Sequence, residues 1–81
     1  MKKVGNDYGI AQFSVVIEKD KDGYFAFCPE FQGCYTQGKT YEEALQNIVD
    51  AIKLHIEDRI ATGETIKQPE MTSLTQVEVT V

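Results

Sequence analysis

The sequence predicts a small α+β domain of two layers, with the element order β-β-β-α-β. Two short runs of β-branched and aromatic residues flank a charged turn, and glycines bracket a third short run. One long amphipathic stretch with capping residues follows, and the last residues alternate between apolar and polar. Because a sheet and a helix each bury one apolar side, they are expected to pack against each other as two layers.

A β-hairpin is predicted near the N-terminus. Residues 12–18, QFSVVIE, alternate along a strand, and residues 24–28 form the second strand. The turn between them, residues 19–23, ends in Asp-Gly, and Gly23 supplies the positive φ that tight hairpins need. Pro29 has no N–H for a sheet, so the second strand is expected to end before it.

A third strand and the start of a helix follow. Gly33 and Gly38 bracket the third strand, which covers residues 34–37. Thr40 is a favourable N-cap, and Glu43 three residues later completes a capping box. These residues predict that the helix begins directly after Thr40.

The helix is expected to span roughly 20 residues, or about 30 Å, and to stop at Gly63. Residues 64–73 form a connection, residues 75–81 a half-buried fourth strand, and residues 1–9 a flexible arm. The whole chain, residues 1–81, forms one domain. The apolar side of the helix is predicted at Ala44, Leu45, Ile48, Val49, Ile52, Ile56 and Ile60.

The charge balance restricts the classes of partner. The chain has 81 residues, with 13 acidic side chains against 8 basic ones and a net charge of −5. An acidic domain is poorly suited to a phosphate backbone but can attract a basic protein. No run approaches the roughly 20 apolar residues of a membrane helix, so the sequence predicts a cytoplasmic protein with no membrane partner.

The residues with chemical potential do not assemble into a site. Zinc needs about four ligands, and His55 is the one soft ligand beyond Cys28 and Cys34. In the predicted compartment the two thiols stay reduced and pack as small hydrophobes. No nucleophile is placed to use His55 as a base, and Glu18 and its neighbours fit a solvated turn. No catalytic residue, metal or cofactor is therefore assigned, and the chain is not expected to be an enzyme.

The remaining function must come from surfaces. Glu30, Phe31 and Tyr35 lie around the Gly33 bend and are candidates for partner binding, although Phe31 can equally fold back onto the core. The hairpin is apolar on both faces, while one helix covers only one of them. A second copy of the chain is expected to cover the other face, which makes the protein a dimer or tetramer. The candidate oligomer interface consists of Val16, Phe25 and Phe27.

The run VVIEKDKDGYFAFCPEFQGCYTQGKTYEEALQNIVDAI resembles the HicB-like antitoxin family of HicA–HicB toxin–antitoxin pairs. The similarity covers about residues 12–60. Its features are the strand ending in Glu18, Asp22-Gly23-Tyr24, Cys28-Pro29-Glu30, Gly33-Cys34, Gly38, Thr40 and Glu43-Ala44-Leu45. The resemblance implies a partial ribonuclease-H-like fold without its catalytic carboxylates. It also implies that the partner is a HicA-like toxin, a small basic protein that cleaves messenger RNA.

The sequence departs from this family in one respect. Many such antitoxins carry a C-terminal DNA-binding module, and only about 20 residues follow the helix here, so operator binding is not expected. Two alternatives to the antitoxin stay open: an oligomeric domain with another binding role, and a metal-dependent nuclease on the same scaffold. The nuclease would need at least two convergent carboxylates to hold Mg²⁺.

Overall fold

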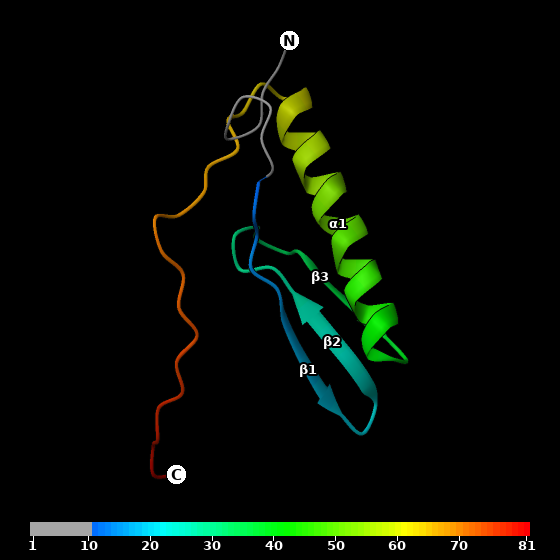
Figure 1. Cartoon of the computed structure of the whole chain (residues 1–81), viewed down its shortest axis with the longest axis vertical. Helices are drawn as coiled ribbons and strands as arrows, with labels where there is room; N and C mark the ends of the chain where they lie inside the picture. The colour runs from blue at the N-terminus through cyan, green and yellow to red at the C-terminus, as the bar shows by residue number, and fades with distance from the viewer. Residues whose placement is uncertain (1–10) are drawn as a thin grey trace.

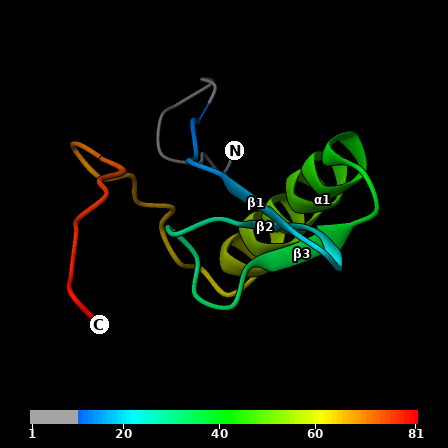
Figure 2. The same ribbon diagram turned by 90° about the horizontal axis from the view of Figure 1, so that it is seen from below.

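The computed structural model describes residues 11–81 and contains a three-stranded antiparallel sheet packed against one helix (Figure 1). The sheet has the order β1-β2-β3, so β1 and β3 are its edges. The helix lies across one face of the sheet (Figure 2). The predicted arm, residues 1–9, lies outside the described residues. The elements are β1 (Val16–Asp20), β2 (Gly23–Phe27), β3 (Tyr35–Gly38) and α1 (Tyr41–Ala61).

The hairpin between β1 and β2 has the tight turn that the Asp-Gly pair predicts. Asp20 pairs with Gly23, which leaves two residues in the loop, and Gly23 has a φ of +135°. The Asp20 carboxylate accepts a hydrogen bond from the Asp22 N–H at 2.7 Å. The Asp20 side chain and Gly23 therefore stabilise the turn together, and the turn sets the register between the two strands.

The register sorts the strand residues onto two faces. Val16 pairs with Phe27 and Ile17 with Ala26, and Phe27 pairs in turn with Tyr35. Paired residues share a face of the sheet. Because Ala26 is buried against α1, Ala26 and the residues paired with it face the helix. Phe27 and the residues paired with it form the outer face of the sheet.

The helix is capped at both ends by the residues that predict it. The Thr40 hydroxyl accepts a hydrogen bond from the Glu43 N–H at 3.0 Å, and the Glu43 carboxylate accepts one from the Lys39 N–H. Gly63, at φ +81°, donates its N–H to the Ile60 carbonyl, and Glu64 donates to the Arg59 carbonyl. These two bonds form a Schellman motif, so the predicted stop at Gly63 is confirmed.

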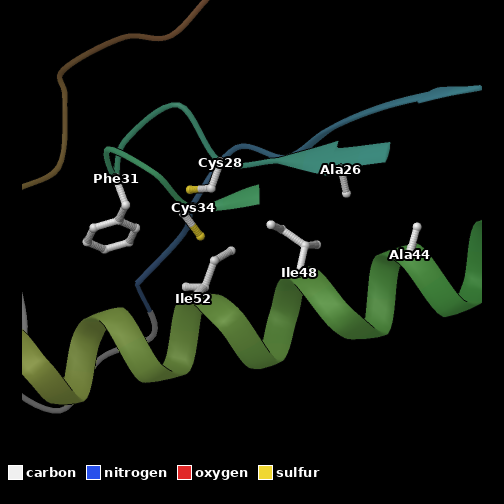
Figure 3. Packing of buried hydrophobic residues seen from close by; sticks show 7 residues of the cluster. All are labelled: Ala26, Cys28, Phe31, Cys34, Ala44, Ile48 and Ile52. Carbon is white, nitrogen blue, oxygen red and sulfur yellow. The ribbon is translucent and has the colours of Figure 1, made fainter. Parts of the chain in front are cut away.

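The core lies between the sheet and the helix (Figure 3). Ala44 and Ile48 are completely buried, and Ala26 faces the helix from β2. Small alanine side chains on both layers let the backbones approach closely, and Ile48 fills the space beside them. The buried cluster is Ala26, Cys28, Phe31, Cys34, Ala44, Ile48 and Ile52.

The predicted fourth strand is wrong for the single chain. Residues 64–81 contain no strand or helix, and every residue from 67 to 81 is exposed. A strand needs a neighbour for its backbone groups, and this segment runs apart from the sheet in both views (Figures 1 and 2). The alternation of residues 75–81 describes which side chains share a face, but it does not provide the neighbouring strand.

Candidate protein-interaction surface

The outer face of the sheet carries a row of apolar side chains across all three strands. Cross-strand pairing places Val16, Phe27 and Tyr35 side by side, with Phe25 further along β2. Tyr35 is 74% exposed and Phe27 is 38% exposed, while Val16 and Phe25 are half-buried. No element among residues 11–81 covers this row, because α1 packs on the opposite face. We call these four residues the outer apolar row.

The polar neighbours of this row give it a partial acidic character. Phe25 pairs with Glu18 of β1 on one side and with Gln37 of β3 on the other, and the side chains of Glu18 and Gln37 are exposed. At the opposite end, a hollow of about 350 Å³ opens beside Phe27, Pro29 and Tyr35. The surface can therefore bury an apolar group of a partner at one end and present a carboxylate at the other.

The loop between β2 and β3, residues 28–34, is held closed by its own backbone. The Cys28 N–H donates to the Cys34 carbonyl at 3.0 Å, and the Phe31 N–H donates to the Cys28 carbonyl at 3.2 Å. Glu30 accepts from the Ser14 N–H at 3.3 Å and from the Cys28 thiol at 3.4 Å. The Glu30 carboxylate therefore joins this loop to the chain that leads into β1.

Phe31 lies in the core, which is one of the two positions that the sequence allows for it. It is 5% exposed, and its ring centroid lies 5.2 Å from that of Phe13 and 5.3 Å from that of His55. The Arg59 guanidinium covers the ring at 5.1 Å. His55 is thus a half-buried packing partner on the rim of the core.

The two cysteines are buried free thiols. Burial raises the pKa of Cys28 from 9.0 to about 11, with the thiol's hydrogen bond to Glu30 contributing in the same direction. Burial also raises the pKa of Cys34. A raised pKa keeps both thiols protonated at neutral pH, and in their buried positions they pack as small hydrophobes, as the sequence indicates.

We expect the native protein to lose stability as the pH rises from about 9 to about 11. The folded state keeps the Cys28 proton that the unfolded state releases near 9.0, so the stabilisation is complete below that pH. It is lost as the pH rises through the folded pKa, and it amounts to at most about 3 kcal/mol. Urea unfolding at pH 8, 9.5 and 10.5 measures it. Cys28→Ala is the control and should flatten this part of the profile.

The described residues offer no assembled metal site. Among residues 11–81, no group of three or more His, Cys, Asp or Glu side chains is placed to hold a metal ion. Glu18, the carboxylate at the end of the first predicted strand, is exposed on the outer face of the sheet. No helix in the described part of the chain is long and apolar enough to cross a membrane.

The candidate partner-binding and oligomer-interface residues are grouped differently in the structure from the grouping that the sequence predicts. Tyr35 joins Val16, Phe25 and Phe27 on one surface. Phe31 is buried in the core and only borders the hollow beside Tyr35, and Glu30 is engaged within the chain. The sequence pattern alone does not show that Tyr35 lies with the hairpin residues. Cross-strand register is the signal that was needed, and it follows only once the 28–34 loop is known to bring β3 beside β2.

A small α+β scaffold with an open aromatic row on one face of its sheet is typical of domains that bind other proteins. The comparisons with known proteins agree with this class. Residues 13–80 match the family described as HicB-like antitoxin of bacterial toxin–antitoxin system. The chain belongs to this family, which indicates an antitoxin role, a toxin as partner and a non-enzymatic activity.

Three relatives illustrate the similarity. A UPF0150 protein of Synechocystis is 46% identical over 63 residues, which cover 76% of this chain and 80% of the relative. A UPF0150 protein of Helicobacter pylori is 60% identical over 45 residues, covering 56% of this chain and 62% of the relative. A third, from Thermoplasma acidophilum, is 42% identical over 65 residues, covering 79% and 94% respectively. No solved structure gives a significant match.

Proposed function

We propose that this domain is an antitoxin that neutralises a HicA-like toxin, a small basic protein that cleaves messenger RNA, by covering the toxin's RNA-binding surface. The observation that carries the proposal is the outer apolar row in a member of the HicB-like family. An uncovered row of two phenylalanines, a tyrosine and a valine has the composition of a protein interface.

The charges support a basic partner. The net charge of −5 attracts a basic protein over the range of the Debye length, about 8 Å at physiological salt. Glu18 then lies on the same face as the aromatic side chains, where a lysine or arginine of the toxin can pair with it. The hollow beside Tyr35 offers a place for one apolar side chain of the toxin.

The proposed antitoxin role also implies a fold assignment and a cellular location for the domain. We infer that the sheet and helix correspond to a partial ribonuclease-H-like fold that acts as a binding scaffold. We also propose that the complex forms in the cytoplasm, where the messenger RNA that the toxin cleaves is translated. Glu30 and Phe31 then support the toxin-binding surface from behind, by holding the 28–34 loop in shape.

The test is inhibition of a purified HicA-like ribonuclease by this domain. We expect the wild-type domain to stop RNA cleavage at a stoichiometric ratio. Val16→Lys and Tyr35→Glu should each weaken inhibition at least tenfold, because they place a charge in the row that the toxin would bury. Leu54→Lys, on the exposed side of α1, is the matched control and should inhibit like the wild type.

The same variants separate the toxin from a second copy as the occupant of this row. The sequence analysis assigns Val16, Phe25 and Phe27 to a homo-oligomer interface, and light scattering of Val16→Lys tests that assignment. Lost inhibition with an unchanged oligomeric state supports the toxin as occupant. Conversion of Val16→Lys to a monomer would instead assign the row to a second copy and contradict the proposed occlusion at this face.

A further inference from the structure

We propose that residues 75–81 of one chain add a fourth strand to the β1 edge of a second copy, giving a dimer joined by exchanged C-terminal strands. This inference goes beyond the proposed function and does not depend on a toxin. It rests on three features of the described residues: an open sheet edge, an apolar groove beside it, and a strand-like segment that lacks a neighbour.

The open edge belongs to β1. Among residues 11–81, β1 pairs with β2 and with no other strand. Alternate N–H and C=O groups of β1 therefore point away from the sheet, and such an edge is a template for another strand. The β3 edge differs, because the Asn47 side chain of α1 donates to the Gln37 carbonyl at 2.8 Å. Gly38 also brings β3 into direct contact with the start of the helix.

The groove lies between α1 and the residues that lead into β1, on the same side of the sheet as the open edge. The helix packs more closely on β3 and β2 than on β1, so one flank of its apolar side extends past the sheet. Leu45 is 37% exposed there, and Val49 and Ile56 are half-buried. An additional strand beside β1 would lie directly over this flank. The groove is lined by Ala11, Phe13, Val15, Leu45, Val49, Ile52, Lys53 and Ile56.

The C-terminal segment has the complementary pattern. Val77, Val79 and Val81 alternate with Gln76, Glu78 and Thr80, so an extended backbone would place three valines on one side. In the single chain these valines are exposed, with 80% for Val77 and 74% for Val79. Beside β1, the valine side would face the groove and the polar side would continue the outer face. Seven residues span about 23 Å and the five residues of β1 about 17 Å, so the added strand would also extend along the residues that lead into β1.

The path of the chain favours a second copy as the source of this strand. Ile66 is buried and the Gln68 side chain donates to the Gln12 carbonyl, so the chain is anchored beside the approach to β1. Residues 69–72 still border residues 12–14, and the segment beyond them runs away from β1 in both views (Figures 1 and 2). The segment reaches outward with its apolar side uncovered, and the β1 edge stays open. A two-fold dimer covers the apolar side of the segment and pairs the β1 edge at the same time, because each copy donates a strand and receives one.

The first test is the oligomeric state of the full chain by light scattering from 1 to 100 μM. We expect a wild-type dimer, and a dissociation constant raised at least tenfold by Val79→Lys, whose charge would enter the groove. Thr80→Lys, on the polar side of the same segment, is the matched control and should remain a dimer. Both positions are exposed in the single chain, so circular dichroism should show unchanged folding.

The second test shows whether the strand is exchanged. A chain with Glu78→Cys is mixed with a mass-tagged chain carrying Ser14→Cys or Glu18→Cys, and the mixture is oxidised. A disulfide between the two different chains is expected for at least one pair. Gln37→Cys on β3 is the control and should give none.

Two results would overturn the proposal. The first is a wild-type chain that stays monomeric over the whole concentration range. The second is a disulfide that forms only when both cysteines are in the same chain, which would mean that the segment returns to its own β1. Neither result bears on toxin inhibition, so this proposal and the proposed function can fail independently.

Discussion

Gly38→Ala is expected to destabilise the domain by about 3 kcal/mol, the upper end of the usual cost of overpacking. A Cβ at this position would lie 2.5 Å from the Ala44 nitrogen and 2.9 Å from the Glu43 carbonyl carbon. Both atoms are backbone at the start of α1, so no side chain can rotate away. The clash would separate β3 from the first turn of the helix. Denaturant unfolding followed by circular dichroism measures the loss.

Gly33→Ala is the matched control for this prediction. Gly33 has a φ of +77°, and an added Cβ would have no neighbour within 4 Å. Its cost is only the strain of a left-handed backbone, about 1–2 kcal/mol. If the two variants lost equal stability, the close approach of β3 to α1 would not be the reason that position 38 is glycine.

Ile48→Ala is expected to cost about 2–5 kcal/mol, because it removes a large side chain from the centre of the core. Ile48 is completely buried between the sheet and α1 (Figure 3). A domain of this size has a total stability of roughly 4–12 kcal/mol, so the variant should be partly unfolded at 37 °C. Thermal unfolding of the wild type and the variant measures the difference.

Leu54→Ala provides the comparison on the same helix. Leu54 is 66% exposed, and exposed substitutions away from special features usually change stability by less than about 0.5 kcal/mol. A loss of the same size in Leu54→Ala and Ile48→Ala would show that the wrong side of α1 has been assigned to the core. The two variants therefore test the orientation of the helix as well as the packing.

The sequence predicted the elements that are stabilised by contacts between nearby residues. Thr40 and Glu43 cap α1 within four residues of chain, Gly63 ends it, and Gly23 closes a two-residue turn. Each of these signals acts locally, so the order β-β-β-α was confirmed. The first strand starts later than predicted, at Val16 instead of residue 12, because residues 12–15 have apolar alternation but no ladder partner within the described chain.

The features that sequence reasoning did not resolve depend on contacts between distant residues. The position of Phe31 was left open because it depends on Phe13 and His55, which approach it only after folding. The contact of Glu30 with Ser14 joins residues 16 positions apart. The fourth strand failed for the same kind of reason, since alternation in residues 75–81 does not specify a neighbour.

The order of β1, β2, β3 and α1 along the chain has a consequence for assembly. Neighbours in the sequence are also neighbours in space, so the sheet and helix form from short loops with little closure entropy, which favours rapid folding. Residues up to Ile66 complete the buried core of the single chain. Folding of the single chain is therefore a unimolecular event that does not require residues 67–81. In the exchanged dimer that we propose, strand pairing is a separate bimolecular step, and protein concentration governs that step alone.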